Sequence, residues 1–127
     1  MSPRTFTQAG IAISLFAALF AAPAFAHHSG AMYDTEQTIE VAATVTGFEW
    51  TNPHAWIQIR ANDEERETAE WDLELGSPAQ LVRQGWRPRI VAPGDDVTIH
   101  FHPHKDGVPT GVLVTITLAN GETLTSD

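Results

Sequence analysis

Apolar and polar residues alternate with a period of two along most of this chain, and this pattern constrains the fold more than any other feature. In TIEVAATV, from Thr38 to Val45, the alternation is regular, and Gly47 then interrupts it. Neighbouring side chains of a strand point to opposite faces, so the pattern predicts half-buried β-strands, with a bend at the glycine of the first. The predicted strands are residues 38–50, 54–61, 68–75, 96–102 and 112–119.

The alternation is interrupted once by a helical signal. Ser77 is a suitable N-cap, Pro78 suits the first helical position, and Gly85 ends the segment. Three strands, a helix and two strands in about 100 residues predict an all-β fold, a five-stranded OB-fold-like Greek-key barrel with one short helix between strands 3 and 4. A β-sandwich is the alternative, but it usually needs about seven strands and no central helix.

The first 26 residues have the three parts of a secretory signal. Arg4 supplies the positive charge, an uncharged apolar run follows, and Ala24 and Ala26 form a cleavage site. A membrane anchor is the alternative, but the run is short for a spanning helix and no charged flank follows it. We therefore expect a periplasmic or secreted bacterial protein, with a signal peptide (1–26), an N-terminal arm (27–37) and one barrel domain (38–127).

The charge and the absence of cysteine limit the classes of partner and of metal site that the mature chain can have. Without Arg4, sixteen acids face six Lys and Arg residues, a net charge of −10 with neutral histidines. Such a surface argues against nucleic acid and anionic membranes and suits a cationic peptide or a metal ion. The chain has no cysteine, so a metal site must use nitrogen and oxygen ligands.

All six histidines follow the predicted cleavage site, three of them as the run H-x-H-x-H from residue 100 to residue 104. His54 lies in the predicted loop between strands 1 and 2, and His102 and His104 lie between strands 4 and 5. These two loops commonly frame the ligand site of an OB-fold. His100 and His102 share a strand face, roughly 6–7 Å apart for a rise of about 3.3 Å per residue. The alternative is that exposed strand histidines have no ligand.

Cleavage after Ala26 would give His27 a second function, because its α-amine and ring nitrogen can then chelate one metal ion. Alternatively, His28 supplies its ring and backbone amide together with that amine. Nitrogen-rich tetragonal sites favour Cu(II), with zinc as a second possibility. An arm of 11 residues spans about 35 Å when extended and can reach either end of the barrel. The candidate metal ligands are His27, His28, His54, His102 and His104.

Four tryptophans are the other unusual feature of the composition. Trp50 and Trp56 flank the turn that carries His54, and we predict Trp50, Asn52 and Trp56 as ligand-binding residues. Core packing is expected instead for Trp71 and Trp86. The acids at positions 70, 72 and 74 share one strand face and are interpreted as solvated. No catalytic residue is singled out, because no nucleophile motif or glycine-rich phosphate loop is present.

Several segments together resemble a family of small exported bacterial proteins known only as a domain of unknown function. These are HHS after the signal, FEWTNPHAWIQI, ELGSP with LVRQGW, PGDDVTIHFHP and the KDG before the last strand. The resemblance covers essentially the whole mature chain, and WTNPHAW is its most specific motif. It implies that His27, His28, His54 and the His102-Pro103 pair belong to the family pattern, whereas His100 and His104 do not match it. It implies no activity.

These observations lead to one main functional expectation and two alternatives. The main one is a periplasmic metal-binding protein, most readily for copper, that sequesters or delivers the ion through His27 and loop histidines. The first alternative is a non-catalytic OB-fold module that binds a cationic peptide, an oligosaccharide or a partner protein through Trp56 and the two loops. An oxidative copper enzyme ranks last, because nothing in the sequence indicates a substrate.

Overall fold

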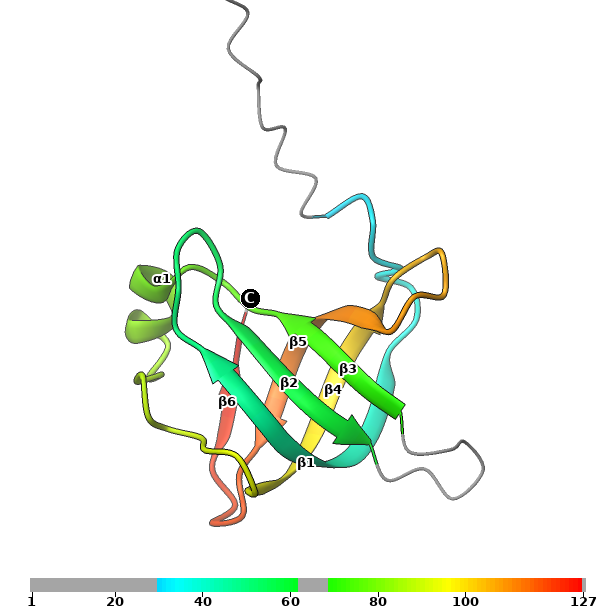
Figure 1. Ribbon diagram of the computed structural model, residues 1–127. Helices are drawn as coiled ribbons and strands as arrows, with labels where there is room; N and C mark the ends of the chain where they lie inside the picture. The colour runs from blue at the N-terminus through cyan, green and yellow to red at the C-terminus, as the bar shows by residue number, and fades with distance from the viewer. Residues whose placement is uncertain (1–29, 62–68, 127) are drawn as a thin grey trace, which may run out of the picture.

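The structure, a computed structural model, describes residues 30–61 and 69–126. Six strands and one helix follow one another along this part of the chain (Figure 1). They are β1 (Ile39–Glu49), β2 (Trp56–Ala61), β3 (Ala69–Glu74), α1 (Pro78–Arg83), β4 (Asp96–Pro103), β5 (Thr110–Thr117) and β6 (Thr123–Thr125). The predicted signal peptide, His27, His28 and the predicted charged loop at residues 62–67 lie outside the described residues.

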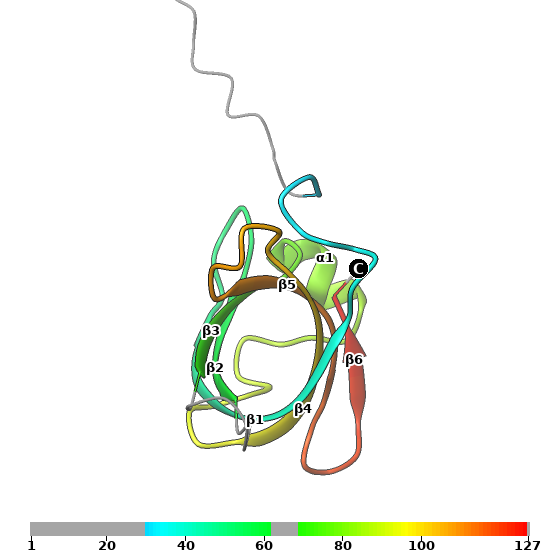
Figure 2. The same cartoon turned by 90° about the vertical axis from the view of Figure 1, so that its right-hand side faces the viewer.

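The first five strands close into a barrel, which Figure 2 shows from the side turned by 90°. β1 is central, because it pairs antiparallel with both β2 and β4. β2 pairs antiparallel with β3, and β4 with β5. A parallel pairing of β3 with β5 closes the barrel. The short strand β6 pairs antiparallel with β5 and adds a sixth strand to the sheet. The predicted OB-fold-like barrel is confirmed, with one strand more than the five predicted.

Gly47 marks an irregularity in β1, as the sequence predicted. The register between β1 and β2 shifts between Val45 and Gly47, and Gly47 lies opposite Gln58. A Cβ atom at Gly47 would lie 2.5 Å from the Gln58 Oε1 atom. The missing side chain therefore leaves room for Gln58 to extend over β1, on the outer face of the barrel.

The core fills the barrel and extends under α1. Inward residues of the strands alternate with more exposed ones, so Val97, Ile99 and Phe101 are buried on one face of β4. Trp86, which follows the helix, is 1% exposed, and its Nε1 donates a hydrogen bond of 2.6 Å to the Thr125 carbonyl. Among the residues described, no helix is long and apolar enough to cross a membrane.

The helix begins as the sequence predicted. The Ser77 side chain accepts a hydrogen bond from the Gln80 backbone N–H, and Pro78 occupies the first helical position. This cap satisfies one of the N–H groups that a helix start leaves unpaired.

Gly111 in β5 lies where β3, β4 and β5 meet. A Cβ atom there would lie 2.6 Å from Phe101 Cδ2 and 2.7 Å from the carbonyl oxygen of His102. Gly111 is paired with Leu73 of β3 and with Pro103 of β4. The close approach of three strands at the parallel closure therefore depends on the absence of a side chain.

Candidate functional site

The N-terminal arm folds back onto the end of the barrel where β4 leads into β5 (Figure 1). Tyr33 forms an isolated antiparallel bridge with His104, and their rings lie edge to face at 6.0 Å. The Lys105 N–H donates a hydrogen bond of 2.9 Å to the Met32 carbonyl, and the Asp34 N–H donates one of 2.8 Å to the Pro103 carbonyl. These backbone bonds fix the arm from residue 32 onward against the segment after β4.

Tyr33 connects this arm to the β1–β2 loop through a buried carboxylate. The Tyr33 hydroxyl donates a hydrogen bond of 2.6 Å to Glu74 Oε2, although the two residues are 41 positions apart. The other Glu74 oxygen, Oε1, lies 2.9 Å from His54 Nδ1. Tyr33 is 3% exposed and Glu74 is 8% exposed. The arm, the end of β3 and the β1–β2 loop are thus joined at one end of the barrel.

The interpretation of Glu74 as one of three solvated acids on β3 is wrong for this residue. Glu74 does lie on the outer face, as the alternation predicted, because its neighbour Leu73 is in the core. The arm covers that part of the outer face, and Tyr33 is buried over it. Period-two alternation gives the face on which a side chain lies, but it does not say which distant segment covers that face.

The hydrogen bonds of His54 and His102 fix the same tautomer in both rings. His54 Nδ1 lies 2.9 Å from the Leu75 carbonyl oxygen, and His102 Nδ1 lies 2.8 Å from the Gln37 carbonyl oxygen. A carbonyl can only accept, so Nδ1 carries the hydrogen in each case. The neutral rings therefore have their lone pair on Nε2, the nitrogen that binds a metal when Nδ1 is held in this way.

His104 has the opposite arrangement. Its Nδ1 atom accepts a hydrogen bond of 3.0 Å from the Asp106 backbone N–H, so the neutral ring carries its hydrogen on Nε2. His100 lies on the outer face of β4, with Nε2 3.3 Å from Glu40 Oε2 and Nδ1 3.1 Å from the Thr115 hydroxyl. Of the predicted loop ligands, His54 and His102 have the tautomer that suits a metal, and neutral His104 does not.

Within residues 30–61 and 69–126, no group of three or more His, Asp or Glu side chains is arranged to hold a metal ion. Tyr33 brings His54 and His104 to the same end of the barrel, whereas His102 bonds to the backbone of Gln37 before β1. The described histidines alone therefore form no complete metal site. His27 and His28 precede this part of the chain.

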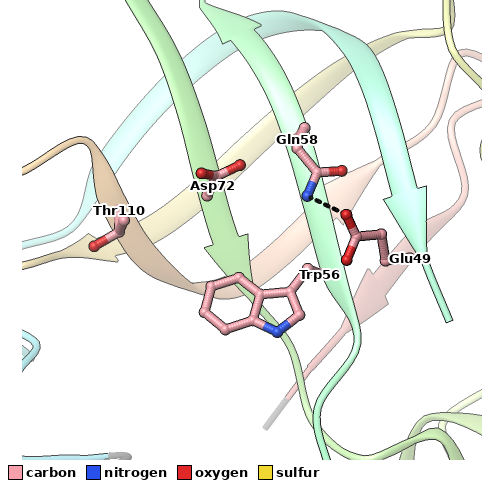
Figure 3. A pocket seen from close by; sticks show the side chains of 5 residues that line it. All are labelled: Glu49, Trp56, Gln58, Asp72 and Thr110. Carbon is pink, nitrogen blue, oxygen red and sulfur yellow. Dashed lines mark hydrogen bonds between the residues drawn. The ribbon is translucent and has the colours of Figure 1, made fainter. Parts of the chain in front are cut away.

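The predicted ligand-binding residues separate into different environments. Trp50 packs with Phe48 against the core, with ring centroids 5.9 Å apart, and Asn52 is exposed before Pro53 in the β1–β2 loop. Trp56 is half-buried on the outer face of β2 and lines a surface depression (Figure 3). We call this hollow the Trp56 depression; its lining residues are Glu49, Trp56, Gln58, Asp72 and Thr110.

Trp71 and Trp86 have the structural role expected of them. Trp86 is fully buried, and Trp71 packs on Phe101 with ring centroids 4.8 Å apart.

Comparison with known proteins adds one finding. The sequence model of a family of unknown function, DUF6152, matches residues 16–114. The chain belongs to this family. Searches of curated proteins and of solved structures each gave no match. The DUF6152 match includes Tyr33, His54 and Glu74, so the connection between arm and barrel lies wholly within the family segment. The resemblance to an uncharacterised family is confirmed.

The environment of Tyr33 predicts that the stability of this protein falls at alkaline pH. Burial raises the pKa of Tyr33 well above its ordinary value of about 10, and the hydrogen bond and the charge of Glu74 raise it further. The folded state thus holds this proton more tightly than the unfolded state. The contribution to stability is complete below the unfolded pKa and is lost as the pH rises above it.

We expect tyrosinate absorbance to remain absent above pH 10 while the protein is folded, and to appear together with unfolding. Tyr33 is the only tyrosine of the chain, so its ultraviolet titration needs no assignment. Tyr33→Phe should lack the additional loss of stability above that pH. Ionisation near the ordinary pKa in a protein that is still folded would contradict the assignment.

Proposed function

We propose that this protein is an exported metal-binding protein that takes up Cu(II) through the amino terminus and ring of His27 together with the ring of His54. It would sequester the ion or pass it on in the periplasm. The observation that supports this most is the contact of Tyr33 with Glu74, because Glu74 also holds His54. The arm that begins with two histidines is thus anchored to the carboxylate that orients a third.

Chain length limits where the mature terminus can lie. After cleavage behind Ala26, only two residues, His28 and Ser29, would separate His27 from Gly30, the first described residue. These three steps along the chain span at most about 10 Å, which limits how far His27 can lie from the anchored part of the arm. The effective concentration of His27 at that end of the barrel is therefore far higher than that of a free histidine.

The chemistry of His54 suits a metal ligand. Its Nδ1 hydrogen is directed at the Leu75 carbonyl and at Glu74, which orients the ring and leaves Nε2 as the nitrogen with the lone pair. A terminal amine and two imidazoles form a nitrogen-rich set, which favours Cu(II) over other divalent ions, with zinc as the second choice. His28 and His102 are alternative ligands, and His104 requires the other tautomer.

Export is part of the same proposal. It depends on the signal-like residues 1–26, and the chelate of His27 exists only after their removal. The precursor would therefore lack the terminal ligand, and the site would form only in the exported chain.

The decisive experiment is a calorimetric Cu(II) titration of the chain that begins at His27. We expect His54→Gln to weaken binding by at least about 30-fold, because removal of a group that only supports a metal ligand already costs about 10–100-fold. His100→Gln is the matched control, because this ring is also hydrogen-bonded on the barrel surface. Equal affinity of the two variants would reject His54 as a ligand.

A further inference from the structure

The acids on the outer face of β1 and β3 are not equivalent. There are five of them: Glu40, Glu49, Glu70, Asp72 and Glu74. Three lie beside a basic side chain, with Glu40 3.3 Å from His100, Glu70 3.2 Å from Arg60 and Glu74 2.9 Å from His54. In the part of the chain that the structure describes, neither Glu49 nor Asp72 pairs with a basic side chain.

Both of these acids line the Trp56 depression (Figure 3). Trp56 and Gln58 both come from β2, and Asp72 lies beside Gln58 on the neighbouring strand β3. None of the described lining residues is basic. A half-buried indole beside two carboxylates is the environment that a cation prefers, because the ring face is electron-rich and the carboxylates supply opposite charge.

Gln58 and Gly47 keep the hollow open. The Gln58 side chain leans over Gly47, where a Cβ atom would meet it at 2.5 Å, and its Nε2 lies 3.4 Å from Glu49 Oε1. In this position Gln58 extends toward β1 and away from Asp72, which is its register partner on β3. The missing side chain at Gly47 therefore affects the position of Gln58 on the surface, and the register shift lies at the same point of the sheet.

We propose that the Trp56 depression binds the protonated tip of a lysine or arginine side chain carried by a cationic partner peptide. The cation would lie against the Trp56 ring, with its N–H groups donating to Asp72, and Glu49 on β1 would add negative charge on the other side of the ring. A peptide is favoured because the mature chain is strongly acidic, so it attracts a polycation over a longer range than one side chain alone. This site uses none of the proposed copper ligands, although Trp56 is the register partner of Glu74, which holds His54.

The test is an NMR titration at physiological salt with EDTA present. The probe is the tripeptide Gly-Lys-Gly with both ends blocked, and the matched probe is Gly-Gln-Gly. We expect the lysine peptide to shift the Trp56 indole N–H saturably, with a Kd in the range of about 1–10 mM. Trp56→Phe identifies this signal among the four tryptophans of the chain. The glutamine peptide should leave the signal unmoved.

Substitutions in the depression, compared with one elsewhere on the surface, distinguish binding at this site from general attraction between opposite charges. Asp72→Asn is expected to raise the Kd by about fivefold, as is Trp56→Leu, because each removes one contact with the cation. Glu122→Gln removes the same charge as Asp72→Asn at an exposed position between β5 and β6, and it should change the Kd by less than about twofold. Equal effects of Asp72→Asn and Glu122→Gln, or no shift of the Trp56 signal, would overturn the proposal.

Discussion

Placing Gly-Ser-Gly before His27 is expected to weaken Cu(II) binding by at least about 100-fold, more than the loss of any single loop histidine. The extension leaves every side chain in place, but it moves the amine away from the imidazole of His27 and so removes the chelate. Three residues are added because one added residue would make His28 the third residue of the chain. That arrangement could form another nitrogen-rich copper site from the amine, two amides and a ring.

His28→Gln in the chain that begins at His27 is the control that separates the two possible chelates. If the amine and ring of His27 bind together, this variant keeps its affinity. If His28 supplies its ring and amide, the variant loses affinity and the extended chain loses it too. An extended chain that binds Cu(II) as tightly as the authentic one would reject the terminal chelate altogether.

Gly111→Ala is expected to lower the free energy of unfolding by about 3 kcal/mol, at the upper end of the usual cost of overpacking. The new methyl group would meet the His102 carbonyl oxygen at 2.7 Å and Phe101 at 2.6 Å. Phe101 is fully buried, and the carbonyl belongs to a paired strand, so neither can move without disturbing the barrel closure. Urea denaturation followed by tryptophan fluorescence measures the loss.

Gly30→Ala is the matched control, because a Cβ atom there meets nothing within 4 Å and the backbone is not in the left-handed region. We expect its unfolding free energy to stay within about 0.5 kcal/mol of the parent protein, as for surface substitutions in general. If Gly111→Ala is equally mild, the three strands can separate slightly at low cost. The close packing at the closure would then not limit stability.

Much of the fold follows from local sequence signals. The alternation predicted the five barrel strands, and Ser77 and Pro78 predicted the start of the helix. Gly47 predicted the irregularity in the first strand. These predictions succeed because each signal acts within a few residues, where strand periodicity and capping chemistry are decisive. The order of the elements then leaves few ways to close a small barrel.

The candidate site was less predictable from the sequence. The sequence predicts His54 and His102 as ligands, but it does not predict that the arm packs on the barrel, and its alternation favours a solvated Glu74, which the structure shows to be buried. Burial of Tyr33 and its bond to Glu74 bring together residues 41 positions apart, and no local pattern encodes such a contact. The lone tyrosine in a polar segment was the one available signal, because a large aromatic ring in an otherwise polar arm is more stable when it is covered.

The parallel pairing of β3 with β5 also bears on when the chain can fold. The pairing of Asp72–Glu74 with Thr110–Val112 can form only after β5 has been synthesised. The pairing of β1 with β4 likewise requires a partner that lies far along the chain. Domains dominated by such distant pairings fold slowly, since long loops must close before the contacts form. The first half of the chain cannot complete the barrel until β4 and β5 have been made. If the chain is exported as proposed above, this delay would leave the precursor without a closed barrel during its synthesis.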